Sequence, residues 1–295
     1  ANLRGIALMA AGMFLFSAVD AIGKLLTDTL PPIQIVWFRQ LGLFLGAIVL
    51  IAMRGRSVLK SKYPSLQIGR GVLAGSSATL FIIGVSYVPL ADAVAITFVA
   101  PFMVTVMGAL ILREKVGLRR WTAVTVGFIG TLIVIRPGMG VVHPAAGLLL
   151  IAATAFALRQ ILSRMVSGGD KTQTTVAYTA IVSGLLLTIP LPFVWETPAT
   201  NLEISLLVAI AVIAAFAETL VIMALDVTQA VVVAPVQYSL IIWGTFYGFF
   251  IFGQLPDGWT WIGTAVIVVT GLYMLTRERV TSRSDRQDDN GGDGL

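Results

Sequence analysis

The sequence predicts an all-helical integral membrane protein with ten transmembrane helices, arranged as two five-helix repeats of inverted topology. Three observations predict this fold: an apolar composition divided into regular segments, basic residues concentrated in alternate loops, and a weak internal repeat. Hydrophobic residues make up 57% of the 295 positions and charged residues only 12%, about half the charged fraction of a typical soluble domain. Ten spans of about 20 residues would leave only short loops and a tail.

Apolar segments follow one another along the chain, separated by stretches that carry charges or helix-breaking residues. They fall at about residues 5–26, 33–53, 66–87, 92–112, 119–136, 144–163, 174–195, 203–224, 230–252 and 259–276. The first segment, preceded by Arg4, resembles a secretory signal, but its pattern recurs in mid-chain, so we expect it to stay as the first helix. The polar residues 277–295 predict a disordered cytoplasmic tail.

Lysine and arginine are unevenly distributed between alternate loops. With the N-terminus placed inside, sixteen of the twenty fall in inner segments, whereas outer segments hold only Lys24 and Arg136. Arg39 and Arg159 lie within apolar runs. Because cytoplasmic loops are enriched in these residues, the bias predicts a multi-pass protein of the bacterial inner membrane with both termini in the cytoplasm. The net charge of +5 therefore indicates topology, and no nucleic-acid partner is expected.

Two pairs of segments resemble each other at nearly the same spacing. "GIALMAAGMFLFSAVDAIGKLL" matches "GLLLIAATAFALRQILSRMV" at a spacing of 142 residues, and "REKVGLRRWTAVTVG" matches "GQLPDGWTWIGTAVI" at 140. These matches predict a first repeat at 4–138 and a second at 144–276. Because each repeat has an odd number of helices, the second enters the membrane from the opposite side. Such an inverted pair can alternately expose one midplane site to the two sides of the membrane.

The segments also resemble a known family. The first helix, the proline-bearing "AITFVAPFMVTVMGALILREKVG" and the Trp-led "RRWTAVTVGFIGTLIVIRPG" are similar to the EamA unit of the drug/metabolite transporter superfamily. The resemblance covers about residues 4–276 and implies a ten-helix basket whose pathway is lined by helices 1, 3, 4, 6, 8 and 9. The second half departs from the pattern, because Gln254 stands where the first half has Glu114, and Ile241 where it has Pro101.

Charged residues inside the predicted spans are the main candidates for substrate binding, because charge within a membrane is costly and usually functional. Arg159, Glu218 and Asp20 lie in helices 6, 8 and 1. An arginine fork matches a carboxylate, and a buried glutamate can carry a proton. Together they suit a zwitterion, or a cation with a coupling proton. Alternatively, Arg159–Glu218 or Asp20–Lys24 form simple ion pairs, and Arg39 is expected to snorkel outward or to pair.

The predicted pathway helices also carry aromatic, hydroxyl and amide side chains, the usual mixture in a small-molecule pocket. The candidates for substrate contact are Phe14, Ser17, Ser77, Thr79, Phe81, Thr97, Phe98, Phe156, Gln237, Tyr238 and Trp243. Any one of these rings could instead serve packing. Pro101 and Pro235 are candidate gating hinges, because proline removes a hydrogen bond from a helix.

Several kinds of chemistry lack the residues that they need. The chain has no cysteine and a single histidine, which excludes disulfides, thiolate metal sites and a zinc-protease helix. It has no phosphate-binding loop and no nucleophile constellation of a known catalytic motif. Neither an enzymatic activity nor a metal or other cofactor is therefore predicted.

The sequence thus predicts a secondary or facilitative transporter that exports or exchanges small metabolites by alternating access. The resemblance is greatest to the superfamily's amino-acid exporters, including those for aromatic amino acids. Two alternatives remain open: proton-coupled efflux or exchange of drugs or nucleoside-like metabolites, and a membrane scaffold subunit that transports nothing. The expected partners are a small-molecule substrate and membrane lipid. The oligomeric state stays open, and a monomer is compatible with the sequence.

Overall fold

A computed structural model describes residues 2–114, 116–136, 143–166, 168–228 and 230–290. Within these ranges all regular structure is helical and no strand occurs. The elements are α1 (Asn2–Leu26), α2 (Pro32–Arg54), a 3₁₀ turn η1 (Arg56–Leu59), α3 (Pro64–Tyr87), α4 (Leu90–Thr97), α5 (Ala100–Ile111), α6 (Leu118–Ile135), α7 (Ala146–Val166), α8 (Thr172–Thr188), α9 (Leu191–Val194), α10 (Asn201–Val227), α11 (Ala230–Val233), a 3₁₀ turn η2 (Ala234–Tyr238), α12 (Ser239–Phe252) and α13 (Gly258–Asn290).

The ends of several helices follow from local sequence. Pro32 and Pro64 occupy the first turns of α2 and α3, where a missing backbone N–H costs nothing and the fixed φ favours the helix. Thr200 and Glu203 form a reciprocal capping box at the start of α10. Gly253 ends α12 in the left-handed conformation, with φ of 64°, which glycine adopts without steric cost.

In the described part of the chain, eight helical stretches are long and apolar enough to cross a membrane, counting Leu90–Ile111 and Ala234–Phe252 as one stretch each. The first part of α13, Gly258–Met274, is a shorter apolar helix. The predicted seventh segment, 174–195, is shorter than expected. Its helix α8 ends at Thr188, and α9 follows after Pro190. Ile189 keeps helical angles, but Pro190 and Pro192 have no N–H to bond back along the helix, which accounts for this break. With α8 included, each of the ten predicted segments is helical, and the fold is an all-α membrane fold.

The predicted fourth and ninth helices are interrupted. The first divides into α4 and α5 at Phe98 and Val99, just before Pro101. The second begins as α11 and the 3₁₀ turn η2, which contains Pro235, before α12 continues. Proline lacks the N–H that would bond four residues back. Each proline therefore lies at a break between two shorter helices rather than at a kink within one continuous helix.

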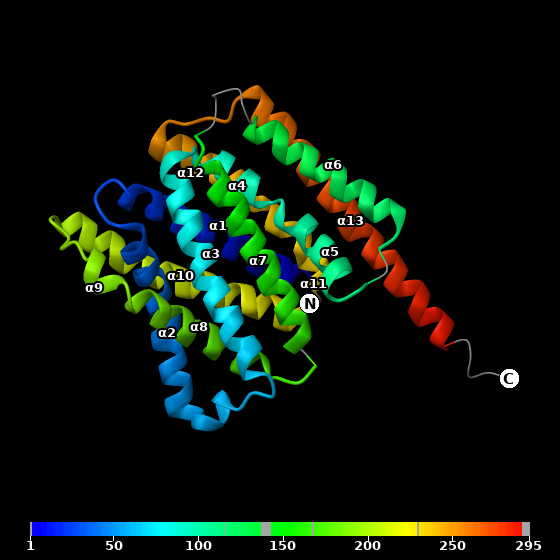
Figure 1. Cartoon of the computed structure of the whole chain (residues 1–295), viewed down its shortest axis with the longest axis horizontal. Coiled ribbons are helices and arrows are strands. Elements are labelled where there is room, and N and C mark those ends of the chain that lie inside the picture. The colour runs from blue at the N-terminus through cyan, green and yellow to red at the C-terminus, as the bar shows by residue number, and fades with distance from the viewer. Residues whose placement is uncertain (1, 115, 137–142, 167, 229, 291–295) are drawn as a thin grey trace.

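Helices of one half pack chiefly on helices of the other half. α1 lies against α10 and α12, α7 lies against α3 and α5, and α6 lies against α13. α6 and α13 run side by side along one edge of the molecule, away from α2 and α8 (Figure 1). Exchanging the two halves converts the α1–α10 pair into the α7–α3 pair. The central packing is thus organised around two equivalent pairs of helices.

Two close helix crossings repeat this equivalence at the level of single residues. A Cβ on Gly42 of α2 would lie 2.5 Å from the carbonyl oxygen of Ala211 on α10. A Cβ on Gly71 of α3 would lie 2.4 Å from Cβ of Val182 on α8. The two crossings correspond when about 140 is added to the residue numbers of the first half: Gly42 corresponds to Val182, and Gly71 to Ala211. Only glycine permits these backbones to approach so closely, as is usual where membrane helices cross.

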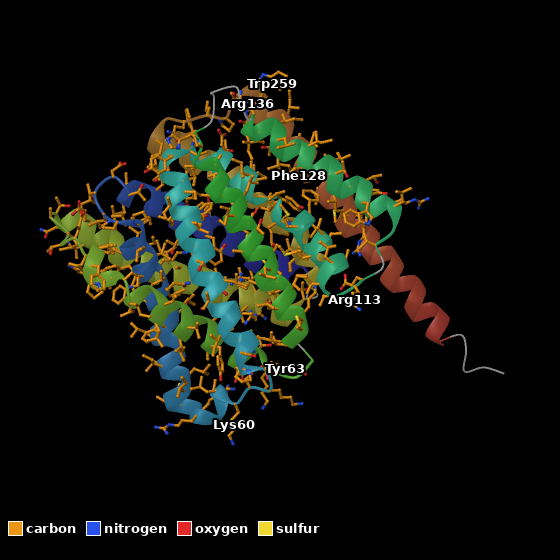
Figure 2. All side chains as sticks on the ribbon, in the orientation of Figure 1. Lys60, Tyr63, Arg113, Phe128, Arg136 and Trp259 are labelled. Carbon is orange, nitrogen blue, oxygen red and sulfur yellow. The ribbon has the colours of Figure 1, made fainter. Side chains whose placement is uncertain are left out.

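Basic side chains from different predicted inner loops gather toward one end of the bundle. Lys60 and Arg113 lie toward the lower end in Figure 2, whereas Arg136 and Trp259 lie toward the opposite end. At the C-terminus, α13 continues to Asn290, where the sequence predicts a disordered tail. Extending an existing helix requires no new nucleation, which favours this continuation. Residues 291–295 lie outside the described part of the chain.

Candidate functional site

Arg159 presents unpaired donors inside the bundle. Its guanidinium carbon lies 4.8 Å from the centre of the Phe156 ring, one turn earlier on α7, a cation–π contact. Its side chain is half-buried and forms no hydrogen bond or ion pair with any described residue, and none of its nitrogens is sealed from solvent. The N–H groups of Arg159 are therefore open to water or to a ligand.

Glu218 lies on α10 and is the acidic group whose charge acts on Arg159. Its carboxylate is also half-buried, without a hydrogen bond to the described residues and without a sealed oxygen. The simple Arg159–Glu218 ion pair, one of the two pairings that the sequence leaves open, is not formed. Two opposite charges, one on α7 and one on α10, are thus both available to a third group.

Asp20 is engaged differently. One oxygen of its carboxylate lies 3.1 Å from Nη1 of Arg39 on α2, and the two side chains are only 12% and 19% exposed. The alternative pairing with Lys24 is not formed, because the Lys24 amine donates hydrogen bonds of 2.6 Å to the carbonyls of Val85 and Val88. Carbonyls at a helix C-terminus lack helical donors and attract such a cation. Substrate contact by Asp20 stays a prediction.

Arg70 is the residue that the sequence reasoning missed. A count of basic residues by loop assigns it to an inner segment, yet it lies inside α3 and is buried. Its Nε donates to Ser163 on α7 at 2.8 Å, and its Nη1 donates to Gln67 at 3.0 Å and to Thr179 on α8 at 3.2 Å. The predicted apolar segment 66–87 contained the necessary signal, because Arg70 falls within it.

The predicted aromatic candidates form two groups. Phe14 of α1 packs edge-on against Trp243 of α12, with ring centroids 5.0 Å apart, and also lies beside Tyr247 at 5.6 Å. Phe98 stacks on Tyr238 with a centroid separation of 4.8 Å. Phe98 lies at the break between α4 and α5, and Tyr238 at the junction of η2 and α12. The two interrupted helices therefore meet through a pair of stacked rings.

Most of the predicted hydroxyl candidates bond to backbone. Ser77 donates to the carbonyl of Ala152 on α7, whereas Thr79 and Thr97 donate to carbonyls of their own helices. Ser17 is fully buried, and its oxygen has no hydrogen-bond partner among the described residues. Of the remaining candidates, Phe156 and Gln237 are exposed and Phe81 packs partly buried against the largest core cluster. Arg159 and Glu218 thus keep open polar atoms, and Phe156 is exposed beside Arg159, whereas most of the hydroxyl groups are already bonded to backbone.

Two cavities lie away from these charges. One, of about 250 Å³, is lined by Tyr87, Val88, Pro89, Asp92, Arg136, His143, Leu255 and Asp257. There the rings of Tyr87 and His143 stack 4.6 Å apart, and Arg136 pairs with Asp257 at 2.7 Å. The other, of about 290 Å³, is an apolar hollow between α5 and α6 that includes Phe102 and Phe128. Neither contains the Arg159–Glu218 pair.

Polar contacts also link the loops near Arg70. The carboxylate of Asp170 accepts hydrogen bonds from Ser61, from the backbone N–H of Lys62 and from Gln67. Burial acts to raise the pKa of Asp170, but these hydrogen bonds and the Lys62 charge outweigh it and hold the pKa below its ordinary value. The ionised carboxylate therefore ties the loop before α3 to the loop before α8.

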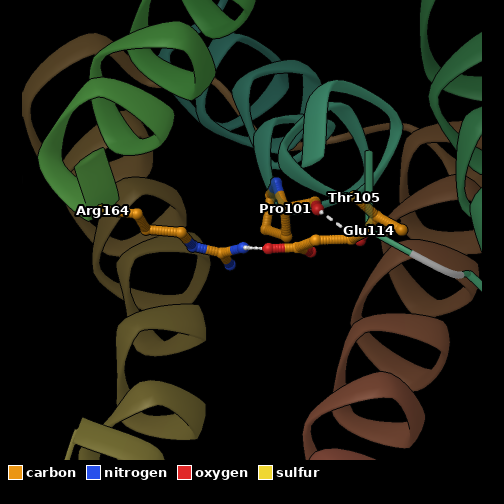
Figure 3. Close-up of polar contacts among 4 residues, drawn as sticks. All are labelled: Pro101, Thr105, Glu114 and Arg164. Carbon is orange, nitrogen blue, oxygen red and sulfur yellow. Dashed lines mark hydrogen bonds and ion pairs between the residues drawn. The ribbon is translucent and has the colours of Figure 1, made fainter. Parts of the chain in front are cut away.

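Glu114 follows α5 and pairs with Arg164 of α7 at 3.3 Å (Figure 3). In the same view, the Thr105 hydroxyl donates to the carbonyl of Pro101 at 3.3 Å. Both partners of the Glu114 pair are nearly half exposed, so solvent weakens their attraction. Gln254 aligns with Glu114 in the sequence, and its buried amide oxygen accepts no hydrogen bond from the residues that the structure describes.

The described side chains include no group of three or more His, Asp or Glu residues arranged to hold a metal ion. What the fold offers instead is a bundle of membrane-spanning helices with unpaired charges inside it. This combination is typical of membrane transport proteins, in which polar groups within the bilayer mark a substrate path.

The comparisons with known proteins agree with that class. The model of the EamA-like transporter family matches residues 3–136 and again 143–277, and the chain belongs to this family. A solved crystal structure matches with a TM-score of 0.63 and 17% identity, covering 95% of this chain and 99% of the other, which supports the fold alone.

Curated relatives are transporters of several small molecules. The chain is 25% identical to an S-adenosylmethionine uptake transporter of Rickettsia prowazekii over 97% of both chains. It is 28% identical to a pseudopaline exporter of Pseudomonas aeruginosa, over 90% of this chain and 93% of the relative. It is 29% identical to a riboflavin transporter of Vibrio cholerae over 78% of both. These names point to a small-metabolite transporter rather than an enzyme, and they differ in direction and cargo.

Proposed function

We propose that this protein is a secondary or facilitative carrier for a small zwitterionic metabolite of the amino-acid class. Arg159 would bind the carboxylate of the cargo and Glu218 its ammonium group. The observation that carries the proposal is that both side chains lie within membrane-spanning helices, act on each other electrostatically, and still have open, unpaired polar atoms. A zwitterion would satisfy both charges at once.

The packing of the bundle supports alternating access as the mechanism. The α1–α10 and α3–α7 pairs are equivalent under exchange of the two halves. Arg159 belongs to one pair and Glu218 to the other. A rocking motion between the pairs would therefore change the distance between the two charges, and cargo bound to both would couple occupancy to that motion.

Among the relatives, S-adenosylmethionine supports this class of cargo most directly, because the compound is an amino-acid derivative with both an ammonium and a carboxylate group. Riboflavin is not an amino acid, so the family's range extends beyond this class. In this proposal the chain lies in the bacterial inner membrane with both termini in the cytoplasm, as the loop charges predict.

The test is counterflow of radiolabelled amino acids in proteoliposomes that contain the purified protein. We expect at least one amino acid to exchange and to be competed by others of similar side chain, but not by lipophilic cations. Competition by lipophilic cations alone would instead favour a drug carrier. Absence of exchange for every amino acid, with the protein folded, would contradict the amino-acid proposal.

A further inference from the structure

Arg70 carries a charge that its neighbours do not balance. It lies in a membrane-spanning helix and is only 7% exposed. The three side chains that accept its hydrogen bonds, Ser163, Gln67 and Thr179, are all neutral. Within the described ranges no carboxylate lies within ion-pair distance of it. Burying a cation without a counter-ion is costly, so a charge of this kind usually has a partner.

Asp170 does not supply that partner. It reaches Arg70 only through the side chain of Gln67, which donates to Asp170 and accepts from Arg70. Its charge acts instead on Lys62, from whose backbone N–H it also accepts a hydrogen bond. The charged group whose field acts on Arg70 is Arg159, another cation.

The second terminal nitrogen of Arg70 is open. Nε and Nη1 donate the hydrogen bonds to Ser163, Gln67 and Thr179. Nη2 forms none with the described residues, and it is absent from the polar atoms that are sealed and unpaired. Since every other donor of this side chain is fixed by a helix neighbour, Nη2 is held in place and accessible to a ligand.

Ser163 connects the two arginines. Its hydroxyl accepts from Arg70 and donates to the backbone carbonyl of Arg159, one turn earlier on α7. Arg70 is thereby anchored to the helical turn that carries Arg159. The charge of Arg159 also acts on Arg70, which places the two guanidinium groups in one region of the bundle.

The charge count of that region is one-sided. The cations are Arg39, Arg70 and Arg159: the charge of Arg39 acts on Arg159, and that of Arg159 acts on Arg70. The anions are Asp20 and Glu218. Arg39 and Asp20 cancel as an ion pair. This leaves two arginines and one glutamate, an excess of one positive charge within the bundle.

We propose that Arg70 and Arg159 together form an anion subsite that accepts a second carboxylate, so that the cargo is an aminodicarboxylate. This inference rests on the proposed function and deepens it. The ammonium group of the cargo meets Glu218, one carboxylate meets Arg159, and the other is received by Nη2 of Arg70 with Arg159 beside it. A net charge of minus one on the cargo balances the excess positive charge of the site.

A purely structural role would not require the charge of Arg70. Its hydrogen bonds to Ser163, Gln67 and Thr179 join α3 to α7 and α8, and a neutral amide could make bonds of this kind without the cost of burying a cation. Arginine adds a fixed fork of donors that matches a carboxylate.

The experiment compares L-glutamate with L-glutamine, which have nearly the same shape and differ by one negative charge. Binding is measured as thermal stabilisation of the purified protein in lipid nanodiscs over a range of probe concentrations. For the natural sequence we expect glutamate to bind about ten- to a hundredfold more tightly, the range of a hydrogen bond to a charged group. In Arg70→Gln that preference should fall to about one, while glutamine binding persists.

Two further variants separate recognition from folding. Arg70→Lys keeps the charge and loses the fork, and should retain part of the preference for glutamate. Thr179→Val removes one hydrogen bond of the same network without changing any charge, and should retain all of it. Equal binding of the two probes by the natural sequence, or an undiminished preference in Arg70→Gln, would overturn the anion subsite.

The outcome is independent of the test of the proposed function. Exchange of amino acids in proteoliposomes together with no preference for glutamate would leave the carrier proposal standing and remove only the second carboxylate. A preference for glutamate that disappears in Arg70→Gln supports the subsite even if the best transported cargo is a larger aminodicarboxylate than glutamate.

Discussion

Two pairs of opposite charges lie within the helices of this protein, and they differ in one respect. Asp20 and Arg39 are in contact at 3.1 Å and largely buried. Arg159 and Glu218 act on each other electrostatically but remain apart, with open polar atoms. The first pair compensates its own charge. The second pair leaves its charge available, and the difference separates a group that holds helices together from one that can bind cargo.

The contrast has a physical basis in what each pair loses when one member is removed. Removing a partner from a closed, buried pair leaves an uncompensated charge and destabilises the fold. Removing Arg159 or Glu218 breaks no hydrogen bond or ion pair with the described residues, and what Arg159 loses is its cation–π contact with Phe156. Most of the cost therefore falls on the binding of cargo. Stability and transport should therefore respond in opposite ways at the two sites.

The largest effect is expected on transport at the open pair. Arg159→Ala or Glu218→Gln should lower exchange flux by about ten- to a hundredfold, as the loss of a charged hydrogen bond to cargo implies. The melting temperature should change little, because neither side chain bonds to the described residues. Flux in proteoliposomes and melting temperature are measured on the same preparations. Normal flux in both variants would favour a membrane scaffold that transports nothing.

A smaller effect, on stability, is expected at the closed pair. Asp20→Ala should destabilise the protein by about 3 kcal/mol, because it leaves the Arg39 guanidinium buried without its partner. The double variant Asp20→Leu with Arg39→Leu should recover much of that loss, since apolar side chains of similar size remove both charges. Thermal unfolding in detergent measures both. An Asp20→Ala protein of unchanged stability would show that this contact is not structural.

The smallest effect, on the pH dependence of stability, is expected at Asp257, which is paired with Arg136 but exposed. The hydrogen bond from the backbone N–H of Thr260, together with the Arg136 guanidinium, lowers the pKa of Asp257 at the start of α13. A depressed folded-state pKa adds stability above the ordinary aspartate pKa of about 3.9, and this stability is lost as the pH falls through the folded value.

Asp257→Asn should accordingly reduce the loss of melting temperature between about pH 5 and pH 2. The amide can still accept the backbone hydrogen bond of Thr260, so the variant isolates the charge. If the melting temperature of the variant fell with pH just as that of the natural sequence does, the charge of Asp257 would not contribute to acid sensitivity.

Much of the architecture could be predicted from sequence because it depends on local patterns. Apolar length gave the helices, and proline placed the breaks at Pro101 and Pro235. Partners across the bundle were harder to predict. Asp20 has a lysine one turn away on its own helix, yet it pairs with Arg39 of the next helix, because packing rather than sequence spacing decides which side chains meet.

Arg70 shows a second limit of the sequence. Counting basic residues by loop is informative about topology but treats every arginine near a helix end as equivalent. Whether such a residue faces water or neighbouring helices depends on the packing of α3 against α7 and α8. Its burial could only be recognised once those helices were placed.

The most direct test of the central claim uses the absence of natural cysteine in this chain. Single cysteines are introduced by Glu218→Cys, Ser17→Cys and Phe216→Cys, and labelled in nanodiscs with a water-soluble, charged thiol reagent. Phe216 lies on the same helix at nearly the same depth but on an outer face, 63% exposed, and Ser17 is fully buried. A thiol must ionise to react, which requires water.

If the space between Arg159 and Glu218 is open and polar, the cysteine at position 218 should react rapidly, and the cysteines at positions 17 and 216 should react slowly or not at all. Labelling at position 218 that is no faster than at position 17 would contradict the account, because it would mean that water and cargo do not reach the charges on which the transport proposal depends.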